Sequence, residues 1–277
     1  MLSTSYVYLQ DCILIWYNAL MNKENTLEYK KLRKWNIRAG SLHLLSLIGV
    51  VALANNFSLP VVATYMTGPP GSNLSTGPIT LFSVRMAYTI GLFLALSAFF
   101  HFFIASKNVF PRYIEGLKNK RNYFRWVEYS LSSTLMIFAI AQLNGISNYA
   151  TLLAICGVNV SMILFGWLQE KYAKPGDKQW LPFIFGCIAG IIPWIIFTIQ
   201  LITPMNTSSD RAPGFVYGIV ISLFLLFNCF AIVQYLQYRA KGKWANYLRG
   251  EKAYIILSFV AKSLLAWQIF AGTLAAK

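Results

Sequence analysis

Charged side chains are scarce in this chain of 277 residues, and acidic ones are the scarcest. Lys, Arg, Asp and Glu together make up 12% of the sequence, whereas about 25% is usual in soluble proteins. Hydrophobic residues reach 57%. This composition excludes an ordinary soluble domain and indicates an integral membrane protein.

Cysteine and histidine are too few and too scattered to form a metal site or a disulfide framework. The four cysteines share no metal-ligand spacing, and three of them lie inside apolar stretches, where they are expected to pack as small side chains. His43 and His101 are the only histidines. Since no nucleophile stands beside a base and no soluble catalytic domain is evident, the sequence predicts neither a metal site nor an enzyme.

Seven long apolar stretches account for most of the chain. They cover about residues 38–57, 81–106, 122–144, 148–170, 180–203, 213–238 and 251–274. A helix needs about 20 apolar residues to cross roughly 30 Å of hydrocarbon, and a backbone in lipid must satisfy its own hydrogen bonds. The sequence therefore predicts an all-α membrane protein with seven transmembrane helices, in one membrane domain over 29–277. No internal repeat is evident, which disfavours a transporter built from inverted halves.

Basic residues concentrate on one side of the predicted membrane. Of the 24 lysines and arginines, 20 precede the first apolar stretch or follow the second, fourth and sixth. The other side holds only Arg211 and Lys277. The positive-inside rule therefore places the N-terminus in the cytoplasm and the C-terminus outside the cell. The basic connections, 107–125 and 239–252 among them, are expected to contact anionic lipid headgroups rather than nucleic acid.

Two segments outside the apolar stretches are distinctive. Residues 1–20 are apolar, but they lack a basic lead-in, carry Asp11 and are short for a membrane span. We expect either that they lie on the membrane surface or that Met21 is the true start, and we treat 1–28 as a cytoplasmic extension. The external loop 57–80 carries no charge and contains Gly-Pro-Pro-Gly at 68–71, which favours a short β-hairpin.

Few ionisable side chains fall deep inside the apolar stretches. Lys262 is the only lysine there and Glu128 the only acid. At about 1.5 Å per residue, Glu128 lies roughly 9 Å and the Lys262 backbone roughly 16 Å from the cytoplasmic surface. Because a helical side chain leans toward its own N-terminus, the amine reaches back toward Glu128 and Ser258. His43 and His101 lie at about 8 Å, so all five are expected at a similar depth.

This group of residues has a functional and a structural interpretation. A buried lysine can form a Schiff base with an aldehyde, and Glu128 is then the one acid placed to balance its charge. Alternatively, Lys262 and Glu128 form an ion pair that only orients two helices, although intramembrane charge favours function. Each histidine is explained equally well by helix packing and by proton handling. Arg85 lies near the outer end of its stretch, where it is expected to extend to the interface.

The sequence around these residues resembles the heliorhodopsin family. The similar motifs are RWVEYSLSS (125–133), NVSMILFGWLQEKY (159–172), PGFVYGI (213–219), VQYLQYRAKGKWANYLRGE (233–251) and SFVAKSLLAWQIF (258–270). The resemblance extends over about residues 29–274. It implies a rhodopsin-like bundle with a cytoplasmic N-terminus, a homodimer, and an external loop that forms short strands.

The resemblance also implies a ligand and a set of roles. All-trans retinal would be bound as a protonated Schiff base on Lys262, with Glu128 as its counterion and Ser258 beside it. His43 and His101 would belong to a polar cavity on the cytoplasmic side that takes part in proton movement. The residues implied around the retinal are Tyr129, Asn159, Met162, Ile163, Gly166, Trp194, Phe227 and Gln234. Without the resemblance, ordinary packing explains the aromatic and methionine side chains, whereas the missing side chain of Gly166 would leave room for a bulky ligand.

The implied function is light sensing. Isomerisation of retinal would change the charge near Glu128 and drive a slow conformational change that an unknown cytoplasmic partner detects, without ion pumping. A light-gated proton or ion channel is the alternative, because the cytoplasmic half of the predicted bundle is polar. Pumping is disfavoured, since no carboxylate lies in the outer half of any apolar stretch. A transporter or a non-retinal receptor built on Lys262 and Glu128 would show no visible absorption with retinal.

Overall fold

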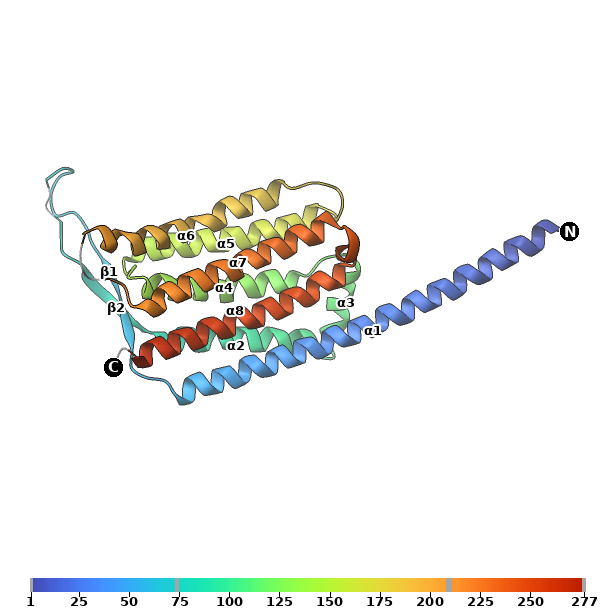
Figure 1. Cartoon of the computed structure of the whole chain (residues 1–277), viewed down its shortest axis with the longest axis horizontal. Coiled ribbons are helices and arrows are strands. Elements are labelled where there is room, and N and C mark those ends of the chain that lie inside the picture. The colour runs from blue at the N-terminus through green and yellow to red at the C-terminus, as the bar shows by residue number, and fades with distance from the viewer. Residues whose placement is uncertain (1, 73–74, 208–210, 276–277) are drawn as a thin grey trace.

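Long helices form most of the chain in the computed structural model, which describes residues 2–72, 75–207 and 211–275, with side chains for 26–72, 75–203 and 211–272 (Figure 1). The helices described are α1 (Leu2–Ala52), α2 (Met86–Ala105), α3 (Phe110–Lys118), α4 (Tyr123–Leu143), α5 (Tyr149–Tyr172), α6 (Leu181–Thr207), α7 (Gly214–Arg239) and α8 (Tyr247–Ala275). The strands β1 (Ser58–Ala63) and β2 (Ile79–Arg85) and the short 3₁₀ helix η1 (Gly242–Ala245) complete the described elements.

The long helices close into a ring. In chain order α1, α2, α4, α5, α6, α7 and α8 each pack against the next, and α8 packs against α1. Six of the described helices are long and apolar enough to cross a membrane, one of them over the part of α1 from Thr26 to Ala52. The apolar stretches of the sequence therefore form the helices that the pattern predicts.

Among the described residues, α4 is the one long helix that is not apolar enough to count as a membrane span by itself. It lies between α2 and α5, and its polar residues Arg125, Glu128, Ser132 and Ser133 are buried among the other helices. Polar side chains inside a membrane protein face the protein rather than the lipid. The low hydropathy of α4 therefore reflects the polar side chains that this helix places in the interior of the bundle.

The predicted hairpin is present, although its second strand begins later than the loop pattern suggested. Strand β1 pairs antiparallel with β2, and the register shifts between Val61 and Val62. The Val62 N–H donates to the Ser147 carbonyl at 2.9 Å, which ties the hairpin to the connection between α4 and α5. Residues 81–85, assigned to a helix from their apolarity, belong to β2, because pairing with β1 decides between strand and helix in a short apolar run.

Arg85 consequently ends a strand and does not lie within a helix. It pairs with Ser58 across the hairpin, and its side chain is exposed. Its Nη1 donates to the Tyr88 hydroxyl at 3.1 Å, and its guanidinium lies 5.5 Å from the centroid of that ring. Arg85 is thus held at the surface of the bundle where β2 joins α2, close to where the sequence placed it.

Two further boundaries differ from the sequence-based prediction. The first apolar stretch was expected to reach residue 57, but α1 ends at Ala52, and the Asn55 side chain accepts the Phe57 N–H at 3.1 Å in the turn that follows. Helix α3 was not predicted, because its nine residues include charged ones and only Tyr113 and Leu117 are buried. The sequence-based expectations for the placement of residues 1–20 concern side chains that lie outside the described ones.

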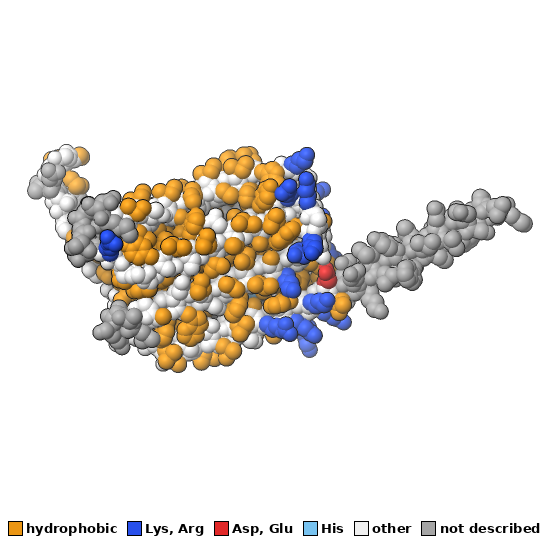
Figure 2. Space-filling model, in the orientation of Figure 1, with side chains coloured by type: hydrophobic (Ala, Val, Ile, Leu, Met, Phe, Trp, Pro, Cys, Tyr) orange, Lys and Arg blue, Asp and Glu red, His pale blue; other side chains and the backbone are white. Residues whose placement is uncertain are grey.

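The surface of the bundle divides into a hydrophobic band and a basic end. On the face shown in Figure 2, hydrophobic side chains cover the middle, and lysines and arginines gather where α1 leaves the bundle. We call this end, with residues 30–38, 107–121, 171–178 and 239–252, the basic end, and the opposite one, with β1 and β2, the hairpin end. A wide apolar band on multiple long helices is the surface of a multi-pass membrane protein.

We expect the turn after α3 to be sensitive to a single methyl group. A Cβ at Gly116 would lie 2.7 Å from the Arg121 carbonyl oxygen, and backbone cannot move aside cheaply. Gly116→Ala should therefore destabilise the protein by about 1–3 kcal/mol, as overpacking does. Thermal unfolding in detergent, followed by tryptophan fluorescence, measures this change.

Gly157→Ala is the matched control, because a Cβ there meets no atom within 4 Å. It should leave stability unchanged or raise it by about 0.5–1 kcal/mol. Equal destabilisation by the two substitutions would contradict the close approach at Gly116.

Candidate functional site

A buried ion pair joins α8 to α4. The Nζ atom of Lys262 lies 2.5 Å from Oε1 of Glu128, and both side chains are almost completely buried. The Ser97 hydroxyl of α2 donates to the same carboxylate oxygen at 2.8 Å. The ammonium group also lies 5.3 Å from the centroid of the Tyr129 ring. A charge in a membrane interior is stable only with such partners, so the pair holds α2, α4 and α8 together.

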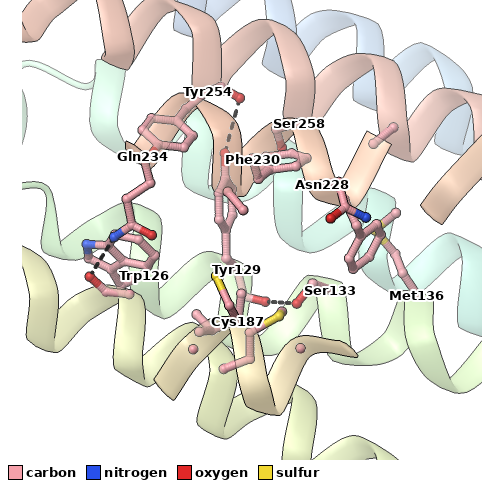
Figure 3. A pocket seen from close by; sticks show the side chains of 18 of the residues that line it. Trp126, Tyr129, Ser133, Met136, Cys187, Asn228, Phe230, Gln234, Tyr254 and Ser258 are labelled. Carbon is pink, nitrogen blue, oxygen red and sulfur yellow. Dashed lines mark hydrogen bonds between the residues drawn. The ribbon is translucent and has the colours of Figure 1, made fainter. Parts of the chain in front are cut away.

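A cavity of about 170 Å³ opens beside Lys262, between α4, α5, α6, α7 and α8 (Figure 3). One water molecule needs roughly 10–15 Å³ by the same measure, so this cavity is far larger than a packing defect. Of the residues expected around a ligand, the structure places these on its wall: Tyr129, Met162, Ile163, Gly166, Trp194, Phe227, Gln234, Ser258 and Lys262.

Sequence reasoning missed part of the wall. Further lining residues include Trp126, Ser133, Met136, Cys187, Asn228, Phe230 and Tyr254, labelled in Figure 3. Except for Asn228, which directly follows Phe227, they stand one or two turns from predicted residues on the same helices. Helical periodicity from Tyr129, Phe227 and Ser258 was therefore the signal that could have found several of them.

Hydrogen bonds to backbone carbonyls fix the orientation of the wall (Figure 3). The Tyr129 hydroxyl donates to the Tyr254 carbonyl at 3.1 Å, which joins α4 to α8. Gln234 of α7 donates through Nε2 to the Gly166 carbonyl of α5 at 3.1 Å. The Ser133 hydroxyl donates to the Tyr129 carbonyl at 2.6 Å. The cavity therefore keeps a defined shape, as a preformed ligand site requires.

The space left by Gly166 is filled by protein. A Cβ on Gly166 would lie 2.5 Å and 2.7 Å from two ring carbons of Trp126. The Trp126 indole N–H donates to Glu170, so the ring is held where it is. The missing side chain thus makes room for the indole, and Gly166 and Trp126 both line the cavity.

Asn159, expected in the same pocket, lies behind its wall. Its Nδ2 donates to the hydroxyls of Ser133 at 2.9 Å and Thr134 at 3.0 Å, and its side chain is buried. Of these two acceptors, only Ser133 lines the cavity. Asn159 therefore supports a lining residue and does not line the cavity itself.

The two histidines stack on each other beside the ion pair. Their ring centroids are 5.6 Å apart, and the planes differ by 12°. His101 Nδ1 lies 2.8 Å from Oδ1 of Asn36, whereas neither ring nitrogen of the fully buried His43 has a hydrogen-bond partner among the described residues.

A second cavity, of about 30 Å³, lies next to His101 and Glu128 and has room for roughly two water molecules. Its lining also includes Asn36, Asn122 and Glu251. Glu128 lines this small cavity and not the large one, and His43 lines neither. The ion pair thus lies between the large cavity on the lysine side and, on the carboxylate side, a small cavity to which Asn36, Asn122 and Glu251 contribute polar side chains.

Sequence reasoning also missed a cluster of charges at the basic end of the bundle. Arg125 of α4 lies between Glu170 of α5 and Glu251 of α8, and all three are buried. The guanidinium stands 4.1 Å from the centroid of the Tyr254 ring, which lines both cavities. The sequence held a signal for this cluster, because Glu170 ends one apolar stretch, Glu251 begins another, and Arg125 lies near the start of a third.

The arrangement suits one kind of chemistry. A lysine amine beside a mostly apolar cavity can hold an aldehyde covalently, and the adjacent carboxylate can balance the positive charge that results. Among the described residues no group of three or more His, Cys, Asp or Glu side chains is arranged to hold a metal ion. The lysine amine beside this mostly apolar wall is suited to an apolar aldehyde.

Comparison with known proteins agrees with this geometry. The family model described as Heliorhodopsin matches residues 32–274. No curated protein sequence matches the chain. The light-driven proton pump of Leptosphaeria maculans superposes with a TM-score of 0.62 at 13% identity, over 88% of this chain and 96% of that one.

Two other solved structures are similar. The transmembrane domain of the Salpingoeca rosetta rhodopsin phosphodiesterase has a TM-score of 0.63 at 9% identity and covers 90% of this chain and 86% of its own. Xanthorhodopsin, a light-driven ion pump with dual chromophore, has a TM-score of 0.62 at 12% identity and covers 88% and 92%. At these identities the likeness establishes the fold alone.

A double-mutant cycle tests the ion pair in protein prepared without an added aldehyde. Glu128→Gln leaves a buried ammonium without its anion and should destabilise the protein by about 3–5 kcal/mol. Adding Lys262→Met removes the remaining charge and should restore most of the loss, because a neutral pair has no desolvation penalty. Thermal unfolding of the four proteins measures the coupling. Additive effects of the two substitutions would contradict the pair.

Proposed function

The chain belongs to the heliorhodopsin family, and we propose that it is a light-sensing retinal photoreceptor that does not pump ions. Membership makes it a retinal-binding rhodopsin. The observation that carries the finer proposal is the position of Lys262, buried beside Glu128 at the wall of an apolar cavity.

The residues around the cavity fit retinal. We propose that Lys262 holds all-trans retinal as a protonated Schiff base, and that Tyr129, Trp194 and Phe227 contact it along the cavity. Retinal bound in this way absorbs visible light and isomerises. The wall is mostly aromatic and aliphatic, and the backbone hydrogen bonds of Tyr129 and Gln234 hold it in place.

Glu128 has the role of counterion in this proposal. It holds a proton at the nitrogen of Lys262 by providing the negative charge, and Ser97 donates to its nearer oxygen. Ser258 lies on the same wall, and its buried hydroxyl has no partner among the described residues, so it is available to the lysine nitrogen. His101, hydrogen-bonded to Asn36 beside the small cavity, is placed to accept a proton, with His43 stacked on it.

The distribution of carboxylates supports sensing over pumping. A pump needs groups that pass a proton onward on both sides of the lysine. Among the described side chains, the buried acids are Glu128 and Glu251, near the starts of α4 and α8, and Glu170, near the end of α5. These are the ends of the three helices at the basic end, away from the hairpin. Ser222 and Gln268, which hydrogen-bond to each other between α7 and α8, are poor proton donors. Light-driven pumping is a property of two of the structurally similar proteins and is not carried over to this chain.

We further propose the topology and the partners. Counting α4 as a span gives seven transmembrane helices, and the charge at the basic end favours a cytoplasmic N-terminus and an extracellular C-terminus. The basic end contacts anionic lipids and offers a docking surface for a signalling partner. The exposed side chains of Leu81 and Phe82 on β2 suit the homodimer that the family implies. The proposal includes no enzymatic activity.

The visible spectrum tests the photoreceptor. Protein purified with all-trans retinal should show a visible absorption band, and Lys262→Ala should abolish it, because no other lysine reaches the cavity among the described residues. Lys252→Ala, which removes a lysine that stacks on Trp35 away from the cavity, is the matched control and should keep the band. A folded wild-type protein without the band would refute the proposal.

Transport measurements separate the sensor from its alternatives. Illuminated vesicles that contain the protein should show no change of internal pH, and voltage-clamped cells should show no photocurrent. A stationary photocurrent that reverses with the imposed ion gradient would identify a channel. A current that persists against the gradient would identify a pump. The Leptosphaeria maculans pump serves as the positive control.

A further inference from the structure

Trp35 holds two cations at the seam where α1 and α8 pack side by side (Figure 1). The guanidinium carbon of Arg38 lies 5.7 Å from the centroid of the indole ring, and Nζ of Lys252 lies 5.0 Å from it. Arg38 belongs to α1 and Lys252 to α8, and no other described aromatic ring at the surface has cations from two helices beside it. The ring itself is half-buried against the cluster that includes Leu32 and Ile255, so the position of the two charges is fixed.

No carboxylate of the described residues balances these two charges. Arg38 and Lys252 are exposed, and neither is in an ion pair with a described side chain. The nearest acids in sequence are engaged elsewhere, since Glu28 accepts a hydrogen bond from the connection before α8 and Glu251 is buried in its ion pair with Arg125. Two cations held on one ring repel each other, so an anion that binds both is stabilised there.

The surface beyond the two cations is apolar. Both helices run from the basic end toward the hairpin end (Figure 1). Four exposed residues therefore stand one or two turns deeper than the cations, on the same faces of their helices: Leu42 and Leu45 of α1 and Ile256 and Val260 of α8. They belong to the two segments Thr26–Ala52 and Tyr247–Gly272, which are long and apolar enough to cross a membrane. A tryptophan between basic and apolar residues is typical of the membrane–water interface.

We propose that Trp35, Arg38 and Lys252 form a binding site for one anionic phospholipid, with its phosphate between the two cations and its acyl chains along the four apolar residues. We call this the Trp35 site. A guanidinium group can donate two parallel hydrogen bonds to phosphate oxygens, and an ammonium group adds a mobile point charge. The Trp35 site deepens the proposed contact of the basic end with anionic lipid and rests on the proposed membrane orientation.

The apolar continuation favours a lipid over a soluble anion. A free phosphate ion would satisfy Arg38 and Lys252, but it would leave the apolar residues below them uncovered. A phospholipid meets both requirements, because its charge and its chains are joined at the depth where the surface changes from basic to apolar. One such molecule would contact α1 and α8 together and would link the first helix to the helix that carries Lys262.

Native mass spectrometry of the full-length protein, released from maltoside micelles, tests the Trp35 site. With equal amounts of phosphatidylglycerol and phosphatidylcholine present, the wild type should retain one phosphatidylglycerol at a collision energy that removes phosphatidylcholine. The double variant Arg38→Gln, Lys252→Gln should lose this selectivity. In a titration, its affinity for phosphatidylglycerol should be weaker by about 10- to 30-fold, as expected for two basic residues at an anionic headgroup.

The matched control removes the same charge elsewhere at the basic end. Lys107 and Lys118 are exposed and lie on either side of the Trp35-free helix α3, so Lys107→Gln with Lys118→Gln should keep the affinity within about twofold of the wild type. Equal retention of the two lipids by the wild type, or equal weakening by the two double variants, would overturn the proposal. Displacement of the lipid by excess inorganic phosphate would also overturn it, because the site would then recognise a free anion.

The visible spectrum keeps this test separate from that of the photoreceptor. Arg38 and Lys252 do not line the large cavity, so their double variant should keep the absorption band of the wild type, which also shows that it is folded. Lost lipid selectivity with an intact band is the expected result. A wild type that selects phosphatidylglycerol but has no band would refute the photoreceptor and leave the Trp35 site standing.

Discussion

An ammonium group in the interior of a membrane protein is tolerated only beside an anion, and Lys262 meets this condition through Glu128. The requirement determines much else in the bundle. It brings α8 against α4, and the Ser97 hydrogen bond adds α2. Because the lysine side of the pair faces the large cavity and the carboxylate side the small one, the same contact lies between the two cavities.

The polar groups of the interior follow one another along the bundle, from the ion pair toward the basic end. Next to the ion pair lie His101 and Asn36, followed by the cluster of Arg125, Glu170 and Glu251 at the basic end. Trp126 and Tyr254 touch both the cluster and the large cavity. Trp126 and Tyr254 therefore connect the wall of the large cavity to the cluster, and Tyr113 of α3 contacts Glu251 within it.

Local patterns were sufficient for some elements and insufficient for others. Apolar length located the long helices, and the turn residues at 68–71 located the hairpin. Apolarity failed at 81–85, because a short apolar run suits strand and helix alike until its pairing partner is known. It also failed at α3, whose burial through Tyr113 and Leu117 depends on neighbours distant in sequence. Helix α4 was identified correctly as a helix, although its polar residues leave it short of the apolarity of the other six.

The sequence by itself determined the membrane class, the positions of the helices, the basic side and the choice of Lys262 and Glu128, because hydrophobic length and the rarity of charge are properties of the chain read in order. The tertiary structure alone decided which acids meet Arg125, why Gly166 must lack a side chain beside Trp126, and that His101, unlike His43, lines a cavity. These outcomes depend on the rotation of each helix about its axis and on its depth against its neighbours. Both are set by contacts between residues far apart in sequence, such as Arg125 and Glu251, and no local pattern encodes them.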